Sequence, residues 1–135
     1  MEEPHKILII DDEEESLELL KLNLEYFGFK VVTALGGFMG LMRAFNEHPD
    51  AIVLDIHMPD MDGWEVCRKL TVNSKTQNIP IVFLTALWGP NDFERAKALD
   101  VKECLTKPVN PEKLAVTLNA ILSIAENSKQ EIGKT

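Results

Sequence analysis

Residues 51–63 read AIVLDIHMPDMDG, so four apolar residues run directly into Asp55 and then into a polar segment. The same change occurs at residues 7–12, which read ILIIDD. A short apolar run bounded by polar residues is typical of a strand that is buried on both faces, as in a parallel sheet covered by helices. The two stretches therefore predict two buried strands that each end in acidic residues.

The rest of the chain alternates between short apolar runs and segments with helical spacing. The predicted strands are residues 7–10, 30–34, 51–54, 81–84 and 103–105. The predicted helices cover residues 17–27, 41–45, 64–70 and 91–99, and a last helix begins at Asn110–Pro111. Strands that alternate with helices predict an α/β fold with a doubly wound, five-stranded parallel sheet and helices on both faces. In such sheets, ligands bind beyond the carboxyl ends of the strands.

Length and composition predict a single soluble domain. The chain has 135 residues, which suits one domain, and we expect it to cover residues 1–127, with 128–135 as a tail or the start of a linker. No apolar run exceeds four residues, whereas a membrane span needs about 20. The acidic start, MEEPHK, does not resemble a secretory signal, so we expect a cytoplasmic protein.

The charge balance argues against two classes of partner. Fourteen Lys plus Arg against 22 Asp plus Glu give a formal charge of −8, and basic residues form no cluster. We therefore expect no direct binding of nucleic acid and no binding to an anionic membrane surface. Cys67 and Cys104 are too few for a zinc site or a disulfide framework, and we expect two buried thiols.

The residues whose side chains can take part in binding or catalysis lie at the ends of the predicted strands. The first strand ends in Asp11 and Asp12, the third in Asp55 and the fourth in Thr85, and the fifth leads to Lys107. The acidic pair alone is explained by helix capping, because acids are favoured at a helix N-terminus. Three carboxylates at one edge, however, repel one another unless a cation is present, and their hard oxygens suit Mg²⁺, with Mn²⁺ as a substitute.

Together these residues predict a phosphoryl-transfer site. Asp55 can serve as a metal ligand only, or it can attack phosphorus as a nucleophile. Thr85 can donate its hydroxyl to a phosphoryl oxygen, and Lys107 can pair with Asp55 or with that oxygen. Taken singly, Thr85 is also explained as a β-branched strand residue and Lys107 as a surface lysine.

Over residues 4–127 the sequence resembles the receiver domains of two-component response regulators. The matching pieces are Asp11-Asp12, the segment Asp55–Gly63, Thr85-Ala86 and Lys107-Pro108. The resemblance implies a flavodoxin-like sheet in the order 2-1-3-4-5 and a cis Lys107–Pro108 bond. It implies that Asp55 accepts a phosphoryl group from a phosphohistidine, that Thr85 and Lys107 bind it, and that the domain then shifts to an active conformation.

The resemblance also implies a metal site and partners. Asp12 and Asp55 would hold Mg²⁺ with the backbone carbonyl of His57, and Asp11 would act mainly through water. The donor would be a histidine kinase or a histidine phosphotransfer protein, and the effector is not specified. A homodimer through the fourth and fifth helices is a further expectation. Val116, Ala120 and Ile124 form an apolar stripe on the last helix, but core packing explains this stripe equally well.

The sequence also departs from the family pattern. Cys104 occupies the position where the family usually has an aromatic residue that reports phosphorylation, and Asp100-Val101 replaces a common Gly-Ala. His57 and Leu87 occupy the positions that tune the lifetime of the phosphoryl group in the family. Trp88 follows in the same loop, where it either packs against its neighbours or anchors a partner.

Two other classes of protein remain as alternatives. An aspartyl-nucleophile phosphatase of the haloacid-dehalogenase type would have Asp-x-Asp-x-Thr at the nucleophile, whereas this chain has Asp55-Ile-His. A phosphate-independent binding module on the same fold would need none of the strand-end residues, yet all are present. A receiver at the start of a longer regulator would have the same residues.

Overall fold

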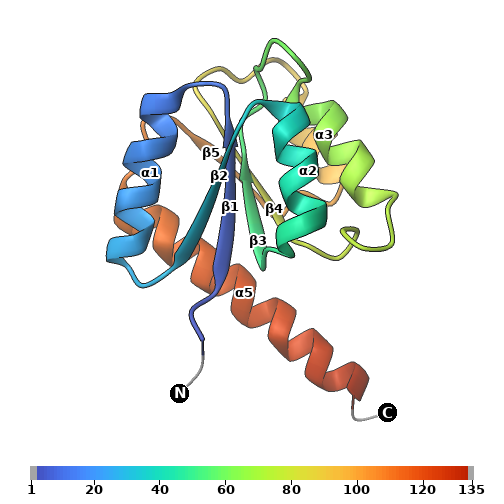
Figure 1. Ribbon diagram of the computed structural model, residues 1–135. Helices are drawn as coiled ribbons and strands as arrows, with labels where there is room; N and C mark the ends of the chain where they lie inside the picture. The colour runs from blue at the N-terminus through green and yellow to red at the C-terminus, as the bar shows by residue number, and fades with distance from the viewer. Residues whose placement is uncertain (1–2, 134–135) are drawn as a thin grey trace.

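The structure is a computed structural model that describes residues 3–133, and its strands and helices alternate along the chain (Figure 1). The strands are β1 (Lys6–Asp11), β2 (Lys30–Leu35), β3 (Ala51–Leu54), β4 (Ile81–Thr85) and β5 (Glu103–Thr106). The helices are α1 (Glu14–Tyr26), α2 (Gly37–Glu47), α3 (Gly63–Thr71), α4 (Asp92–Ala98) and α5 (Pro111–Gly133).

The five strands form one parallel sheet in the order β2-β1-β3-β4-β5, which confirms the predicted fold class and strand order. The register aligns the strand ends that carry the candidate residues. Ile10 pairs with Leu54, so the carboxyl ends of β1 and β3 lie side by side. Thr85 pairs with Thr106, so β4 ends beside the residue that precedes Lys107.

Two layers of helices cover the sheet, with α1 and α5 on one face and α2, α3 and α4 on the other (Figure 1). The side chains of β1 divide between them, because successive residues of a strand point to opposite faces. Ile7 and Ile9 pack against the α1–α5 layer, and Leu8 and Ile10 pack against the α2–α4 layer. Both faces are therefore buried, which explains why the central strands are almost entirely apolar.

The last helix begins as the sequence predicts. The Asn110 side chain accepts hydrogen bonds from the backbone N–H groups of Glu112 (2.8 Å) and Lys113 (3.2 Å). Helix α5 then continues to Gly133, past the domain boundary expected at residue 127. Its stripe of Val116, Ala120 and Ile124 is exposed, which excludes core packing as the explanation of that stripe.

A long-range contact ties α2 to the loop that follows β3. The carboxylate of Asp60 accepts hydrogen bonds from the backbone N–H groups of Gly37 (3.1 Å) and Phe38 (3.0 Å) at the start of α2. These bonds lower the pKa of Asp60, with the Phe38 amide as the largest cause. Asp60 thus caps a helix whose own N-cap residue, Gly36, has no side chain to do so.

The two cysteines differ in their surroundings. Cys67 is fully buried, as predicted, but Cys104 is only half-buried, which corrects the expectation of two buried thiols. Cys104 lies on β5, an edge strand, where one side of the strand lacks a neighbour to cover it. Burial raises the pKa of both thiols to about 11.

Within residues 3–133, no helix is both long enough and apolar enough to cross a membrane.

Candidate functional site

Three carboxylates meet at the carboxyl ends of β1 and β3. One oxygen from each of Asp11, Asp12 and Asp55 lies within 4.8 Å of the others. Asp11 and Asp55 are buried, with 2% and 7% of their surfaces exposed, whereas Asp12 is partly exposed. The parallel register of β1 and β3 produces this cluster, because it aligns the two strands at their carboxyl ends.

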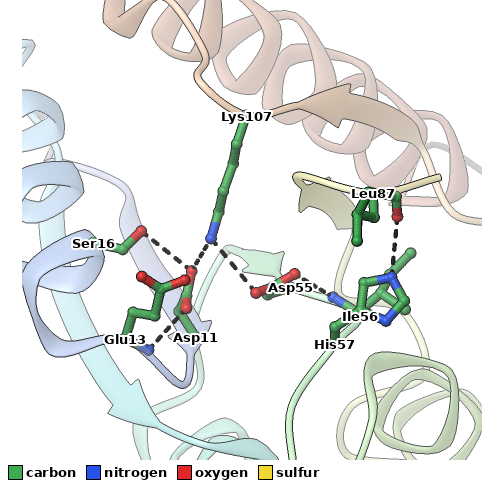
Figure 2. A network of polar contacts seen from close by, with 8 residues as sticks. All are labelled: Asp11, Glu13, Ser16, Asp55, Ile56, His57, Leu87 and Lys107. Atoms are coloured by element: carbon green, nitrogen blue, oxygen red, sulfur yellow. Dashed lines mark hydrogen bonds and ion pairs between the residues drawn. The ribbon is translucent and has the colours of Figure 1, made fainter.

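Lys107 reaches into the cluster from the loop after β5 (Figure 2). Its Nζ lies 2.5 Å from Asp11 Oδ2 and 3.5 Å from Asp55 Oδ2, and its side chain is 19% exposed. The sequence suggested Asp55 as the carboxylate partner of Lys107, but Asp11 is the closer one. The Lys107–Pro108 peptide bond is cis, as the resemblance implied.

Local hydrogen bonds orient the two buried carboxylates. Asp11 accepts bonds from the Glu13 backbone N–H (3.0 Å) and the Ser16 hydroxyl (3.3 Å), both at the start of α1. Asp55 Oδ1 accepts a bond from the Ile56 backbone N–H at 2.7 Å, which leaves Oδ2 directed toward Lys107. Sequence reasoning missed Ser16, although a hydroxyl five residues after Asp11, in the first turn of a helix, was a usable signal.

The site carries more negative than positive charge. Burial raises the pKa of Asp12, and the charges of Asp11 and Asp55 raise it further against the opposing effect of a backbone hydrogen bond. Burial by itself would lower the pKa of Lys107, but its hydrogen bond to Asp11 and the charges of Asp11 and Asp55 raise it. One lysine thus faces three carboxylates, and the site favours a further cation.

The donor set fits a divalent cation of the magnesium type. Magnesium prefers oxygen ligands and is bound in proteins by one or two carboxylates together with water. The close oxygens of the cluster belong to Asp11, Asp12 and Asp55, and the raised pKa of Asp12 shows that a nearby positive charge would stabilise its carboxylate. The His57 ring lies outside this cluster, and the role of its backbone carbonyl as a ligand stays a prediction.

The loops after β3 and β4 close the other side of the site. His57 Nε2 donates a hydrogen bond to the Leu87 carbonyl oxygen at 3.0 Å, which links the two loops (Figure 2). Thr85 is 1% exposed, and its backbone carbonyl accepts a bond from the Lys107 N–H at 2.9 Å. The Thr85 side chain thus lies at the end of β4, beside the residue that precedes Lys107.

The residues selected from the sequence therefore lie in one region. Strand pairing and ion pairs bring Asp11, Asp12, Asp55, Thr85 and Lys107 together. Trp88 packs against its neighbours, which is one of the two roles that the sequence allowed for it. It also donates a hydrogen bond from Nε1 to Thr106 Oγ1 at 2.9 Å. No sequence signal pointed to Thr106, because the contact depends on the path of the loop.

Comparison with known proteins agrees with this geometry. Residues 7–119 match the family model of the response regulator receiver domain. The chain is 39% identical over 123 residues to the alkaline phosphatase synthesis transcriptional regulatory protein PhoP of Bacillus subtilis. This alignment covers 90% of this chain and 50% of PhoP. It is 36% identical over 118 residues to protein PilH of Pseudomonas aeruginosa, covering 87% of this chain and 98% of PilH.

A solved structure shows the same architecture. The response regulator receiver domain protein (CheY-like) from Methanospirillum hungatei superposes with a TM-score of 0.87 at 26% identity, covering 93% of this chain and 98% of that one. The chain belongs to the response regulator receiver domain family, whose members take part in two-component signalling through phosphorylation of an aspartate. It spans about half the length of PhoP and nearly all of PilH.

Proposed function

We propose that Asp55 is the phosphoryl acceptor of this receiver domain and that a Mg²⁺ ion held by Asp12 and Asp55 supports the reaction. The observation that carries the proposal is the position of Asp55, a buried carboxylate at a strand end between a lysine and two further carboxylates. The incoming phosphoryl group is anionic, so a carboxylate nucleophile needs positive charge beside it. Lys107 supplies one such charge, and the neighbouring carboxylates would hold a cation that supplies another.

The reaction moves one phosphoryl group from a phosphohistidine to Asp55. A carboxylate oxygen of Asp55 attacks phosphorus, a P–O bond forms and the P–N bond breaks. The electron pair of that bond stays on the ring nitrogen of the donor histidine, which takes up a proton. When bound, the metal ion neutralises charge on the phosphoryl oxygens. Lys107 holds a second positive charge beside Asp55, and Thr85 donates its hydroxyl to a phosphoryl oxygen.

The same groups convert the chemistry into a signal. A phosphoryl group adds about two negative charges where one carboxylate stood. One hydrogen bond to a charged group contributes about 1.5–3 kcal/mol. Shifting a two-state equilibrium from 1:99 to 99:1 needs about 5.5 kcal/mol. Thr85 alone therefore cannot complete the switch, and Lys107 and partner binding must share it.

The partners we propose follow from this chemistry. The donor is a histidine kinase or a histidine phosphotransfer protein, and the effector is a protein that distinguishes the two states. The exposed stripe of Val116, Ala120 and Ile124 on α5 supports a homodimer. PhoP is named as a transcriptional regulatory protein, but we propose no direct binding of nucleic acid by these 135 residues, because their charge is −8 and no basic cluster is present.

The test is intact-protein mass spectrometry after incubation with acetyl phosphate, with and without Mg²⁺. We expect a gain of one phosphoryl group in the parent protein, only with the metal, and no gain in Asp55→Asn. A histidine phosphotransfer donor, incubated in parallel, checks the natural type of donor. Absence of any gain with both donors would overturn the proposal in favour of a phosphate-independent binding module on the same fold.

A further inference from the structure

Trp88, in the loop after β4, contacts three elements of secondary structure. Its Nε1 donates a hydrogen bond to Thr106 Oγ1 on β5 at 2.9 Å. Its ring stacks on Phe93 in the first turn of α4, with 4.7 Å between centroids and 21° between the planes. It also meets Phe83 of β4 edge-on, with the centroids 6.5 Å apart. One side chain thus contacts β4, β5 and α4.

The register of β4 and β5 places Thr106, the hydrogen-bond partner of this indole, beside Thr85. Phe83 pairs with Cys104, and Thr85 pairs with Thr106. Phe83 and Thr85 point to the same face of the sheet, because side chains alternate along a strand. Cys104 and Trp88 pack against the same core cluster as Phe83. The aromatic ring in this region therefore comes from the loop after β4, while residue 104 on β5 is a cysteine.

The contacts of Trp88 also flank the site. Thr106 is the neighbour of Thr85 across the ladder and directly precedes Lys107, whose backbone N–H bonds the Thr85 carbonyl at 2.9 Å. The residue before Trp88 is Leu87, whose carbonyl accepts the bond from His57. A movement of the Thr85 hydroxyl toward a ligand therefore changes the surroundings of the Thr106 hydroxyl, to which the indole is bonded.

We infer that Trp88 is the positioning residue that couples Thr85 to helix α4, an inference that rests on the proposed phosphorylation of Asp55. When Thr85 turns toward the phosphoryl group, the loop that carries Trp88 shifts, and the indole rearranges over Thr106. The stacked ring of Phe93, which is 57% exposed, moves with it and alters the surface of α4. The aromatic reporter therefore lies on the β4–α4 loop, while residue 104 is a cysteine.

The protein contains two tryptophans, and this allows a direct test. The full chain is labelled with 5-fluorotryptophan, and its fluorine NMR spectrum is recorded before and after phosphorylation by acetyl phosphate with Mg²⁺. Trp88→Phe assigns the two resonances. We expect the Trp88 resonance to shift by more than its linewidth. Mass spectrometry of the same samples records the phosphoryl group.

Two substitutions separate coupling from mere proximity. In the fraction of Thr85→Ala that mass spectrometry shows to be phosphorylated, the shift of Trp88 should be lost, because the moving hydroxyl is absent. Thr106→Val removes the acceptor with little change in shape and should lose most of the shift, whereas Thr117→Val, the same change on α5, should retain it. An unmoved Trp88 resonance in phosphorylated protein would overturn the role of Trp88 alone. A missing mass gain would instead overturn the phosphoryl-acceptor proposal, and this inference with it.

Discussion

The charges of the site dominate its behaviour at the scale of single residues. Asp11, Asp12 and Asp55 share one region with the single ammonium of Lys107. Asp11 is almost completely buried and is satisfied by Lys107, the Glu13 amide and Ser16. Asp12 is partly exposed, and burial and its two acidic neighbours raise its pKa. A bound cation would therefore stabilise the ionised form of Asp12.

We predict that Asp12→Asn stabilises the metal-free protein at neutral pH. A carboxyl group with a raised pKa in the folded state favours folding below its ordinary pKa of 3.8, and it loses that contribution as the pH rises through the raised value. The amide removes this loss. Because the side chain is partly exposed, we expect a gain below about 1 kcal/mol. Urea unfolding in EDTA measures it.

Magnesium should make the parent protein more stable than Asp12→Asn, which reverses the order of stability expected without metal. Ligand binding to the folded state stabilises it by about 2.7 kcal/mol when the ligand is at 100 times its dissociation constant. The parent should gain this stabilisation and Asp12→Asn should gain much less, because it lacks a proposed ligand. Equal stabilisation of both proteins by Mg²⁺ would show that Asp12 is not a ligand.

Helix α3 determines the backbone position of Asp55 at the scale of secondary structure. Gly63, the first residue of α3, donates its N–H to the Ile56 carbonyl at 2.7 Å. A Cβ atom on Gly63 would lie 2.4 Å from the Asp55 carbonyl oxygen and 2.8 Å from Ile56 Cα. Both are backbone atoms, which cannot turn away. The glycine thus allows the helix to pack directly on the segment that carries Asp55.

We predict that Gly63→Ala destabilises the protein by about 1–3 kcal/mol, the usual cost of overpacking, and slows phosphorylation by displacing Asp55. Thermal unfolding and the mass-spectrometric assay measure the two effects. Gly89→Ala is the matched control, because its Cβ would meet only the Asp92 side chain, at 3.2 Å. We expect it to change stability by less than about 0.5 kcal/mol. If both variants behaved alike, the close approach at Gly63 would not be the cause.

The cap that Asp60 provides to α2 makes another prediction. Its lowered pKa means that the ionised carboxylate favours the folded state above the ordinary value of 3.8, and that this contribution is lost as the pH falls through the lowered value. Asp60→Asn should therefore be less stable than the parent at neutral pH, and the difference should vanish in acid. Because Asp60 is exposed, we expect less than about 1 kcal/mol.

Asp60→Ala, which removes the cap altogether, should cost about 1 kcal/mol at neutral pH. Urea unfolding of the parent and both variants across the acidic range gives the comparison. A constant difference between the parent and Asp60→Asn at every pH would refute the assignment of the pH dependence to this carboxylate.

Helix α5 matters at the scale of the whole molecule, because it has two apolar faces. Leu114, Leu118 and Leu122 pack into the core beneath the sheet. Val116 and Ile124, 61% and 66% exposed, lie on the outer side of the same helix. A helix of a monomer usually presents polar residues to solvent, so the outer stripe favours contact with a second copy.

We predict that the double substitution Val116→Ser with Ile124→Ser weakens dimerisation of the phosphorylated protein at least tenfold without loss of phosphorylation. Sedimentation equilibrium in acetyl phosphate and Mg²⁺ measures the dimer. Leu19→Ser on α1 is the control, because Leu19 is also 61% exposed but lies on a different helix. A parent protein that stays monomeric throughout would rule out the homodimer.

Local patterns in the sequence were enough to predict the order of the elements and the parallel sheet. Apolar runs predicted the strands, and the residues immediately after them, Asp11, Asp55 and Thr85, became the site because parallel strands end at one edge. Lys107 was predicted by the same rule. This success has a simple physical cause: periodicity reports burial, and burial on both faces leaves few arrangements open.

Only the tertiary structure decided which distant groups meet. Lys107 lies nearer to Asp11 than to Asp55, Asp60 caps α2, and Trp88 bonds Thr106. Each contact joins residues from different elements, and its partner depends on the paths of loops and on the exact register of the strands. Local spacing in the sequence carries no information about these distances, whereas hydrogen bonds and ion pairs change with fractions of an ångström.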